Sequence, residues 1–114
     1  MENLEIKLGR ICDNEEFITR YRVKNLRTGE EFSRGADEVT PSASTRKTSI
    51  MMAAFQAAKQ GRVDLAAPVT YEEHMSEDVA CGIFRYLTPG VTIPFVDAIT
   101  TMMVLSDNVC TRMV

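Results

Sequence analysis

The sequence predicts a protein of the α+β class, on two observations. Polar and apolar residues alternate in residues 17–24, which is typical of a half-buried strand. Two later stretches, 45–60 and 92–105, are rich in apolar residues and long enough to form helices. The chain has 114 residues, of which 45% are hydrophobic and 25% charged, so we expect one globular domain.

The charge balance excludes several classes of partner. With 16 acidic and 13 basic residues, the sequence carries no basic footprint for nucleic acid and no polybasic membrane patch. No apolar run reaches the roughly 20 residues that span a bilayer. The charged segment Met1–Lys7 also lacks the apolar centre of a signal peptide. The compartment stays open, because a cytoplasmic protein and an exported protein without its signal both fit.

The cysteines predict neither a disulfide scaffold nor a metal site. The chain has three, Cys12, Cys81 and Cys110, and none belongs to a C-x-x-C pair. The single histidine, His74, has no neighbouring ligand set. We therefore expect no metal and no cofactor, and we expect Cys81 and Cys110 to be small buried hydrophobic residues.

The first forty residues predict a helix followed by a β-hairpin. Apolar residues recur at helical spacing in residues 2–11. After the alternating strand 17–24, residues 25–30 form a turn in which Gly29 is free to take a positive φ. Residues 31–33 then return as the partner strand.

A long helix is predicted next, over residues 45–60. Thr40, Ser42 and Ser44 offer hydroxyl groups that can cap its start, and Gly61 follows its end. The centre of this stretch is apolar on nearly every side. A helix of this kind is buried in the core of a larger structure, so we expect its start to open into an interior or a cleft.

Residues 62–90 connect this helix to a second one. Short extended pieces are expected at 63–65 and 68–71, and Pro89–Gly90 marks a turn. The second helix should start near Thr92 and tolerate Pro94 in its first turn. An acidic group in the connection is expected on the solvated surface: Glu72, Glu73, Glu77 and Asp78.

The first chemical signal is a serine three residues before a lysine. Ser44 and Lys47 lie on one face if both belong to the first helical turn. A serine hydroxyl becomes an effective nucleophile when a base removes its proton, and a neutral lysine can be that base. A helix N-terminus adds N–H groups that stabilise an oxyanion. Alternatively, Ser44 only caps the helix and Lys47 is solvated.

A second polar motif, Ser106–Asp107–Asn108, interrupts the apolar run at the end of the second helix. A hydroxyl group there can relay a proton, and an amide can hold a substrate carbonyl or the lysine amine. The structural alternative is a helix end followed by a turn.

Together, the two motifs resemble those of class A serine β-lactamases and penicillin-binding proteins, over nearly the whole chain. Residues 41–47 resemble the segment around the nucleophile of that family, and residues 87–108 resemble its turn and helix into Ser-Asp-Asn. The turn at 27–30 is also similar to a common family feature. The separation between Ser44 and Ser106 is close to the family's.

The resemblance implies a role for each residue of the two motifs. Ser44 would be the acylated nucleophile, and its own backbone N–H would form half of the oxyanion hole. Lys47 would share in its activation, and Ser106 would pass a proton to the leaving ring nitrogen. Asn108 would orient Lys47 and the acylamide group of a β-lactam, while Asp107 would hold the loop in shape.

The resemblance also implies a fold, a partial layered α-β-α β-lactamase/transpeptidase-like fold without its C-terminal strands. Residues 1–114 would form one incomplete domain, in which 1–40 supply the helix and hairpin of the α/β half and 41–114 the buried nucleophile helix and the helical half. No Lys-Thr-Gly follows Asn108, and the family's deacylating glutamate is absent as well. The chain is therefore expected to be an N-terminal portion, which a dimer or a second chain would complete.

Other departures from the family indicate a divergent member. Residues 109–111 replace a small, often alanine-containing sequence, and Thr40 stands where an aromatic residue is frequent. The expected activity is β-lactam hydrolysis through an acyl-serine, with a β-lactam or D-Ala-D-Ala-like small molecule as partner. Two alternatives are a penicillin-binding or esterase-like relative that deacylates slowly, and a non-catalytic helical module. The module would bind protein through its methionines: Met51, Met52, Met102, Met103 and Met113.

Overall fold

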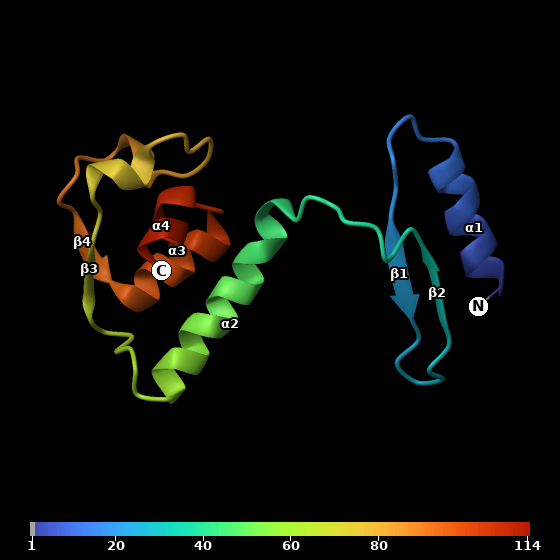
Figure 1. Ribbon diagram of the computed structural model, residues 1–114, viewed down its shortest axis with the longest axis horizontal. Helices are drawn as coiled ribbons and strands as arrows, with labels where there is room; N and C mark the ends of the chain where they lie inside the picture. Colours follow the sequence, from blue (N-terminus) through green and yellow to red (C-terminus); the bar gives the residue numbers. More distant parts are fainter. Residues whose placement is uncertain (1) are drawn as a thin grey trace. The chain divides into compact units, whose positions relative to one another are not determined.

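The computed structural model describes residues 2–114 (Figure 1). The chain forms two compact units, Met1–Pro41 and Ser42–Val114. The first combines one helix, and the second several helices, with a two-stranded antiparallel sheet, so the predicted α+β class is confirmed. No helix among the described residues has the length and apolar character needed to cross a membrane.

The first unit contains the predicted helix and hairpin. Its elements are α1 (Glu2–Asp13), β1 (Tyr21–Lys24) and β2 (Glu31–Arg34), and Val23 lies opposite Phe32 in the hairpin. Gly29 takes the expected positive φ of +78° in the turn.

The predicted strand over residues 17–24 was too long at its start. Residues 17–20 lie outside β1, and Phe17 is 65% exposed. The partner strand β2 ends at Arg34, and Gly35 follows with a φ of +55°, a left-handed conformation that ends the extended partner. Residues 17–20 therefore lie beyond the end of the hydrogen-bonded ladder.

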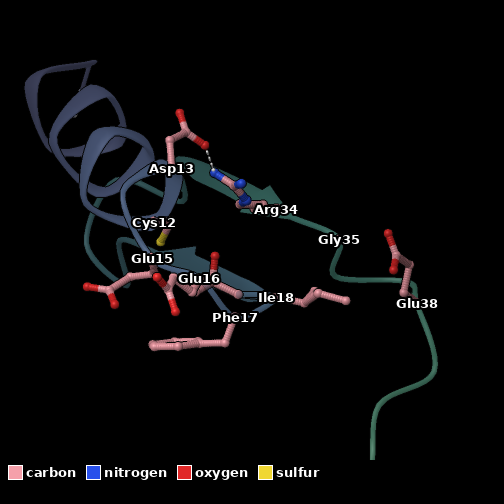
Figure 2. Close-up of a pocket in the computed structure, with 10 residues that line it drawn as sticks. Cys12, Asp13, Glu15, Glu16, Phe17, Ile18, Arg34, Gly35 and Glu38 are labelled. Atoms are coloured by element: carbon pink, nitrogen blue, oxygen red, sulfur yellow. Dashed lines mark hydrogen bonds and ion pairs between the residues drawn. The ribbon is translucent and has the colours of Figure 1, made fainter.

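Polar contacts join the end of α1 to the hairpin. Arg34 donates a hydrogen bond of 2.6 Å to Asp13, as Figure 2 shows. The Asp13 carboxylate raises the pKa of the Arg34 guanidinium above its usual value. Under the sheet, Phe32 is buried and meets Tyr21 edge to face, with ring centroids 6.1 Å apart.

The second unit packs three helices with a short sheet (Figure 1). Strands β3 (Pro68–Thr70) and β4 (Thr92–Pro94) pair antiparallel, with Val69 opposite Ile93. Two 3-10 turns, Glu73–Ser76 and Phe84–Tyr86, lie in the connection between these strands. The helices and strands of the unit are α2 (Arg46–Lys59), β3 (Pro68–Thr70), β4 (Thr92–Pro94), α3 (Phe95–Val104) and α4 (Asn108–Met113).

Helix α2 ends as predicted but begins differently. Gly61 has a φ of +70°, and its N–H bonds the Ala58 carbonyl at 2.9 Å, which closes the last turn. At the start, no hydroxyl side chain caps the helix, so the predicted capping by Thr40, Ser42 or Ser44 was wrong. A 3-10 turn over Ala43–Thr45 leads into α2 instead, and the hydroxyl of Ser44 is engaged elsewhere.

The prediction that the next helix starts near Thr92 was also wrong. Residues 92–94 form β4, and α3 begins at Phe95. The Thr92 hydroxyl bonds that of Thr70 across the sheet at 2.9 Å. The N–H groups of Phe95 and Val96 bond carbonyl oxygens of the Leu65–Ala67 segment, so the first turn of α3 is anchored to the chain leading into β3.

The core of the second unit forms where α2, α3 and α4 meet. Its buried residues are Ala54, Tyr71, Val79, Phe84, Phe95, Ala98, Ile99, Met102, Val109, Cys110 and Met113. Helix α2 is partly exposed in this chain, with Met52 66% and Phe55 43% exposed, so its burial in a larger structure stays a prediction. Met102 is fully buried whereas Met52 is exposed, so the methionines do not share one surface.

Candidate active site

The amine of Lys47 lies at the centre of a polar cluster at the start of α2. The residue is only 2% exposed. Its Nζ donates to Oδ1 of Asn108 at 2.8 Å, and to both the hydroxyl and the carbonyl oxygen of Ser106, at 2.9 and 2.5 Å. A longer contact of 3.4 Å reaches the Ser44 hydroxyl. Four protein oxygen atoms thus replace the water that a buried amine loses.

Ser44 completes the cluster from the 3-10 turn that precedes α2. Its Oγ lies 2.9 Å from Oγ of Ser106, and either atom can be the donor. Ser44 itself is exposed, so the hydroxyl is reachable from solvent although the lysine beneath it is not. The residue before it, Ala43, has a φ of +45°, a strained conformation for a residue with a side chain.

The segment Ser106–Asn108 lies between α3 and the first turn of α4, and the buried side chain of its central residue, Asp107, anchors it. Ser106 has a φ of +55°, so a second strained residue borders the cluster. Asp107 is fully buried, and its Oδ1 accepts hydrogen bonds from the N–H groups of Val109 and Cys110 at 2.9 and 3.0 Å. Asp107 is therefore the N-cap of α4.

A further segment, residues 81–84, contacts this loop and was not singled out from the sequence. The N–H of Phe84 donates to Oδ2 of Asp107 at 2.9 Å, and the N–H of Asn108 donates to the Cys81 carbonyl at 3.0 Å. Cys81 is exposed, so the prediction that it is buried was wrong. In this irregular segment Phe84, and not Cys81, is the residue that packs into the core.

The structure therefore brings together Ser44, Lys47, Ser106 and Asn108, while Asp107 faces away into the core. A hydroxyl beside a second hydroxyl and an amine is a geometry suited to a nucleophile with a proton relay. Among the side chains of residues 4–114, no Asp or Glu carboxylate lies within ion-pair distance of Lys47. Within the same described range, no three His, Cys, Asp or Glu side chains gather to hold a metal.

The first unit contains an open hollow of a different character (Figure 2). It lies beside the end of α1 and the end of β2, and three of its five charged side chains, Asp13, Arg34 and Glu38, form ion pairs. Asp13 bonds Arg34, and Glu38 bonds Arg20 at 2.6 Å. The hollow therefore lacks the buried amine and paired hydroxyls of the cluster around Lys47.

Comparison with known proteins places the chain in a family. A sequence model described as "Beta-lactamase enzyme family" matches residues 4–114. The chain belongs to this beta-lactamase family. Its membership confirms the resemblance predicted from the two motifs. No curated protein sequence matches the chain.

Solved structures agree on the fold of this beta-lactamase family member. A mutant of PBP-A, as an acyl-enzyme complex with penicillin G, is 29% identical and superposes with a TM-score of 0.86, over 99% of this chain and 43% of that one. A mutant class A beta-lactamase of the last common ancestor of Gram-negative bacteria is 21% identical, with a TM-score of 0.79 over 96% of this chain and 41% of that one. The chain thus has part of the class A beta-lactamase fold and spans less than half the length of these structures.

Burial of Cys110 beneath the loop predicts a pH-dependent stability. Burial, and then the neighbouring Asp107 carboxylate, raise the pKa of the Cys110 thiol from 9.0 to about 12. The folded state therefore favours the neutral thiol, and this stabilisation is complete below pH 9 and lost as the pH rises towards 12. We expect Cys110→Ala to weaken the decline of the free energy of unfolding above pH 9 by up to about 1.4 kcal/mol per pH unit.

Urea unfolding at a series of alkaline pH values measures this decline. Cys81→Ala is the matched control, since Cys81 is exposed, and it should follow the wild-type curve. A Cys110→Ala variant with the wild-type pH dependence would contradict the expected coupling.

Proposed function

We propose that this beta-lactamase family member is an acyl-serine enzyme that opens β-lactam rings, with Ser44 as the nucleophile. The contact set of Lys47 carries the proposal. A side chain 2% exposed gathers two hydroxyl groups, one of them on an exposed serine. A lysine that only stabilised the fold would not need to converge on a solvent-accessible hydroxyl.

The proposed reaction uses the hydroxyl groups of Ser44 and Ser106 and the amine of Lys47. Ser44 Oγ attacks the lactam carbonyl carbon, and the bond from that carbon to the ring nitrogen breaks. The proton released by Ser44 passes through the Lys47–Ser106 pair, and Ser106 delivers it to the nitrogen. The contacts of 2.9 Å from Ser106 Oγ to both Ser44 Oγ and Lys47 Nζ support this route. Addition of water to the acyl ester would then free Ser44.

Asn108 supports the proposal in a second way. Its Oδ1 is occupied by Lys47 at 2.8 Å, which leaves the amide N–H groups as donors towards a substrate carbonyl. The residue is partly exposed, so a ligand beside Ser44 can approach it. We propose that Asn108 binds the acylamide group of the β-lactam.

A slowly deacylating, penicillin-binding protein is the second candidate. The comparison with PBP-A, a mutant of which was solved as an acyl-enzyme complex with penicillin G, favours this candidate. The chain is 29% identical to PBP-A and 21% identical to the ancestral class A beta-lactamase. The two candidates share the acylation step and differ in the lifetime of the ester. A helical binding module is less well supported, since its methionines divide between core and surface.

Intact-mass spectrometry with penicillin G tests both candidates. Acylation should add the whole mass of one penicillin, because the opened ring stays attached, and Ser44→Ala should abolish the adduct. Ser49→Ala, an exposed serine on α2, is the matched control and should react like the wild type. An adduct that decays within minutes indicates a β-lactamase, and one that persists for hours indicates a penicillin-binding relative.

Two outcomes would contradict the proposal. One is a wild-type chain that neither accumulates an adduct nor consumes penicillin. The other is an adduct of unchanged yield in Ser44→Ala.

A further inference from the structure

We propose that Gly82 is a positioning residue for this site, acting through Asp107 on the loop that carries Ser106 and Asn108. This inference rests on the proposed function, because one of its tests measures the rate of acylation by penicillin G. Gly82 does not belong to either motif, and it lies in an irregular segment more than twenty positions before the loop in sequence.

The first observation is the lack of space at Gly82. A Cβ atom built there would lie 2.4 Å from Cγ of Asp107 and 2.5 and 2.6 Å from its two carboxylate oxygens. These separations are far shorter than van der Waals contact, so any larger residue must displace the carboxylate. The φ of Gly82 is +121°, which also disfavours a residue with a side chain.

The second observation is that the Asp107 carboxylate has no freedom to move aside. Asp107 is fully buried, and both oxygen atoms accept backbone hydrogen bonds, Oδ1 from Val109 and Cys110 and Oδ2 from Phe84. Displacing it would break bonds that anchor α4 on one side and the 81–84 segment on the other. A side chain at position 82 would therefore displace the Asp107 carboxylate, and this displacement would shift the backbone of the loop.

The third observation is how directly that backbone meets the site. Ser106 contacts Lys47 through its main-chain carbonyl at 2.5 Å as well as through its hydroxyl. Asn108 is fixed by its own N–H to the Cys81 carbonyl, next to Gly82, and binds Lys47 through Oδ1. A shift of the loop by a few tenths of an ångström would change both sets of contacts with the lysine.

Gly82→Ala tests the inference against Gly90→Ala. Gly90 has a φ of +100° and no atom within 4 Å of its virtual Cβ, so its variant carries similar backbone strain without the collision. We expect Gly82→Ala, at a temperature where circular dichroism shows it folded, to lower the penicillin G acylation rate by about tenfold or more. Gly90→Ala should stay within about threefold of wild type.

A double variant separates positioning from general strain. Asp107→Ser removes both carboxylate oxygens, and the remaining hydroxyl can take a rotamer that points away from residue 82. Backbone strain at position 82 is the same in both backgrounds, whereas the contacts with two hydrogen-bonded carboxylate oxygens exist only with the aspartate. We therefore expect the effect of Gly82→Ala on the acylation rate to fall to about threefold or less in the Asp107→Ser background.

Backbone amide NMR shifts provide a reading that does not depend on acylation. Gly82→Ala should move the signals of residues 106–110 more than Gly90→Ala does. If the wild type is acylated but Gly82→Ala reacts at the same rate, the positioning inference is wrong and the proposed function stands. If the wild type is not acylated, the proposed function is wrong, and unmoved signals at 106–110 would overturn the positioning inference as well. An undiminished effect of Gly82→Ala in Asp107→Ser would also overturn it.

Discussion

Replacement of Lys47 by methionine should lower the rate of acylation by penicillin G about 10²–10⁴-fold, the usual range for removal of a group that transfers protons. The methionine fills a similar volume but offers no N–H group to Ser44, Ser106 or Asn108. Stopped-flow or mass-spectrometric measurement of the adduct over time gives the rate.

The same variant should remain folded. No carboxylate among the described side chains, residues 4–114, pairs with Lys47, so the substitution leaves none of them as a buried anion without a partner. Ser106 and Asn108 are partly exposed, and water can replace the lost donors. We expect the free energy of unfolding to change by no more than about 1–2 kcal/mol.

Lys59→Met is the matched control for this variant. Lys59 is the last residue of the same helix and is exposed, so its loss should leave the rate unchanged. A Lys47→Met protein that is acylated within threefold of the wild-type rate would show that the amine takes no part in the reaction.

Replacement of Asp107 by alanine should produce the largest loss of stability. Three backbone N–H groups, those of Phe84, Val109 and Cys110, would lose their acceptor in a fully buried place. An orphaned buried donor costs about 1–3 kcal/mol, so the free energy of unfolding should fall by about 3 kcal/mol or more. Urea unfolding followed by circular dichroism measures this fall.

Asp64→Ala serves as the control, because that aspartate also accepts from a backbone N–H, that of Ala66 at 2.9 Å, but at an exposed site. Water can satisfy the freed N–H there, so the loss should stay below about 1 kcal/mol. Equal losses in the two variants would mean that burial of the Asp107 carboxylate does not matter.

The sequence predicted those elements whose signal is local. The helix before Asp13, the hairpin turn at Gly29 and the end of α2 at Gly61 depend on periodicity or on residues that tolerate a positive φ. The errors occurred where a distant segment decides. Residues 92–94 extend because they pair with Pro68–Thr70, and nothing in the local sequence marks that pairing.

The candidate site shows the same division. Ser44, Lys47, Ser106 and Asn108 were chosen from two short motifs, and the structure brings them together. Gly82 and the Cys81 carbonyl were missed because their importance comes from close approach to the buried Asp107 carboxylate. A glycine in a connecting region can serve a simple turn or a tight contact, and composition does not separate the two.

The hydrogen bond between Ser44 and Ser106 has a consequence for when the chain becomes reactive. The two hydroxyl groups are 62 positions apart in sequence and 2.9 Å apart in space. A chain segment of that length must close before the serine gains its neighbours, and the entropy of closure opposes this step. Until then Ser44 is an ordinary alcohol in water. Under the proposed function, reactivity at this serine would be a property of the folded state, and the share of molecules that react would report the share that has folded.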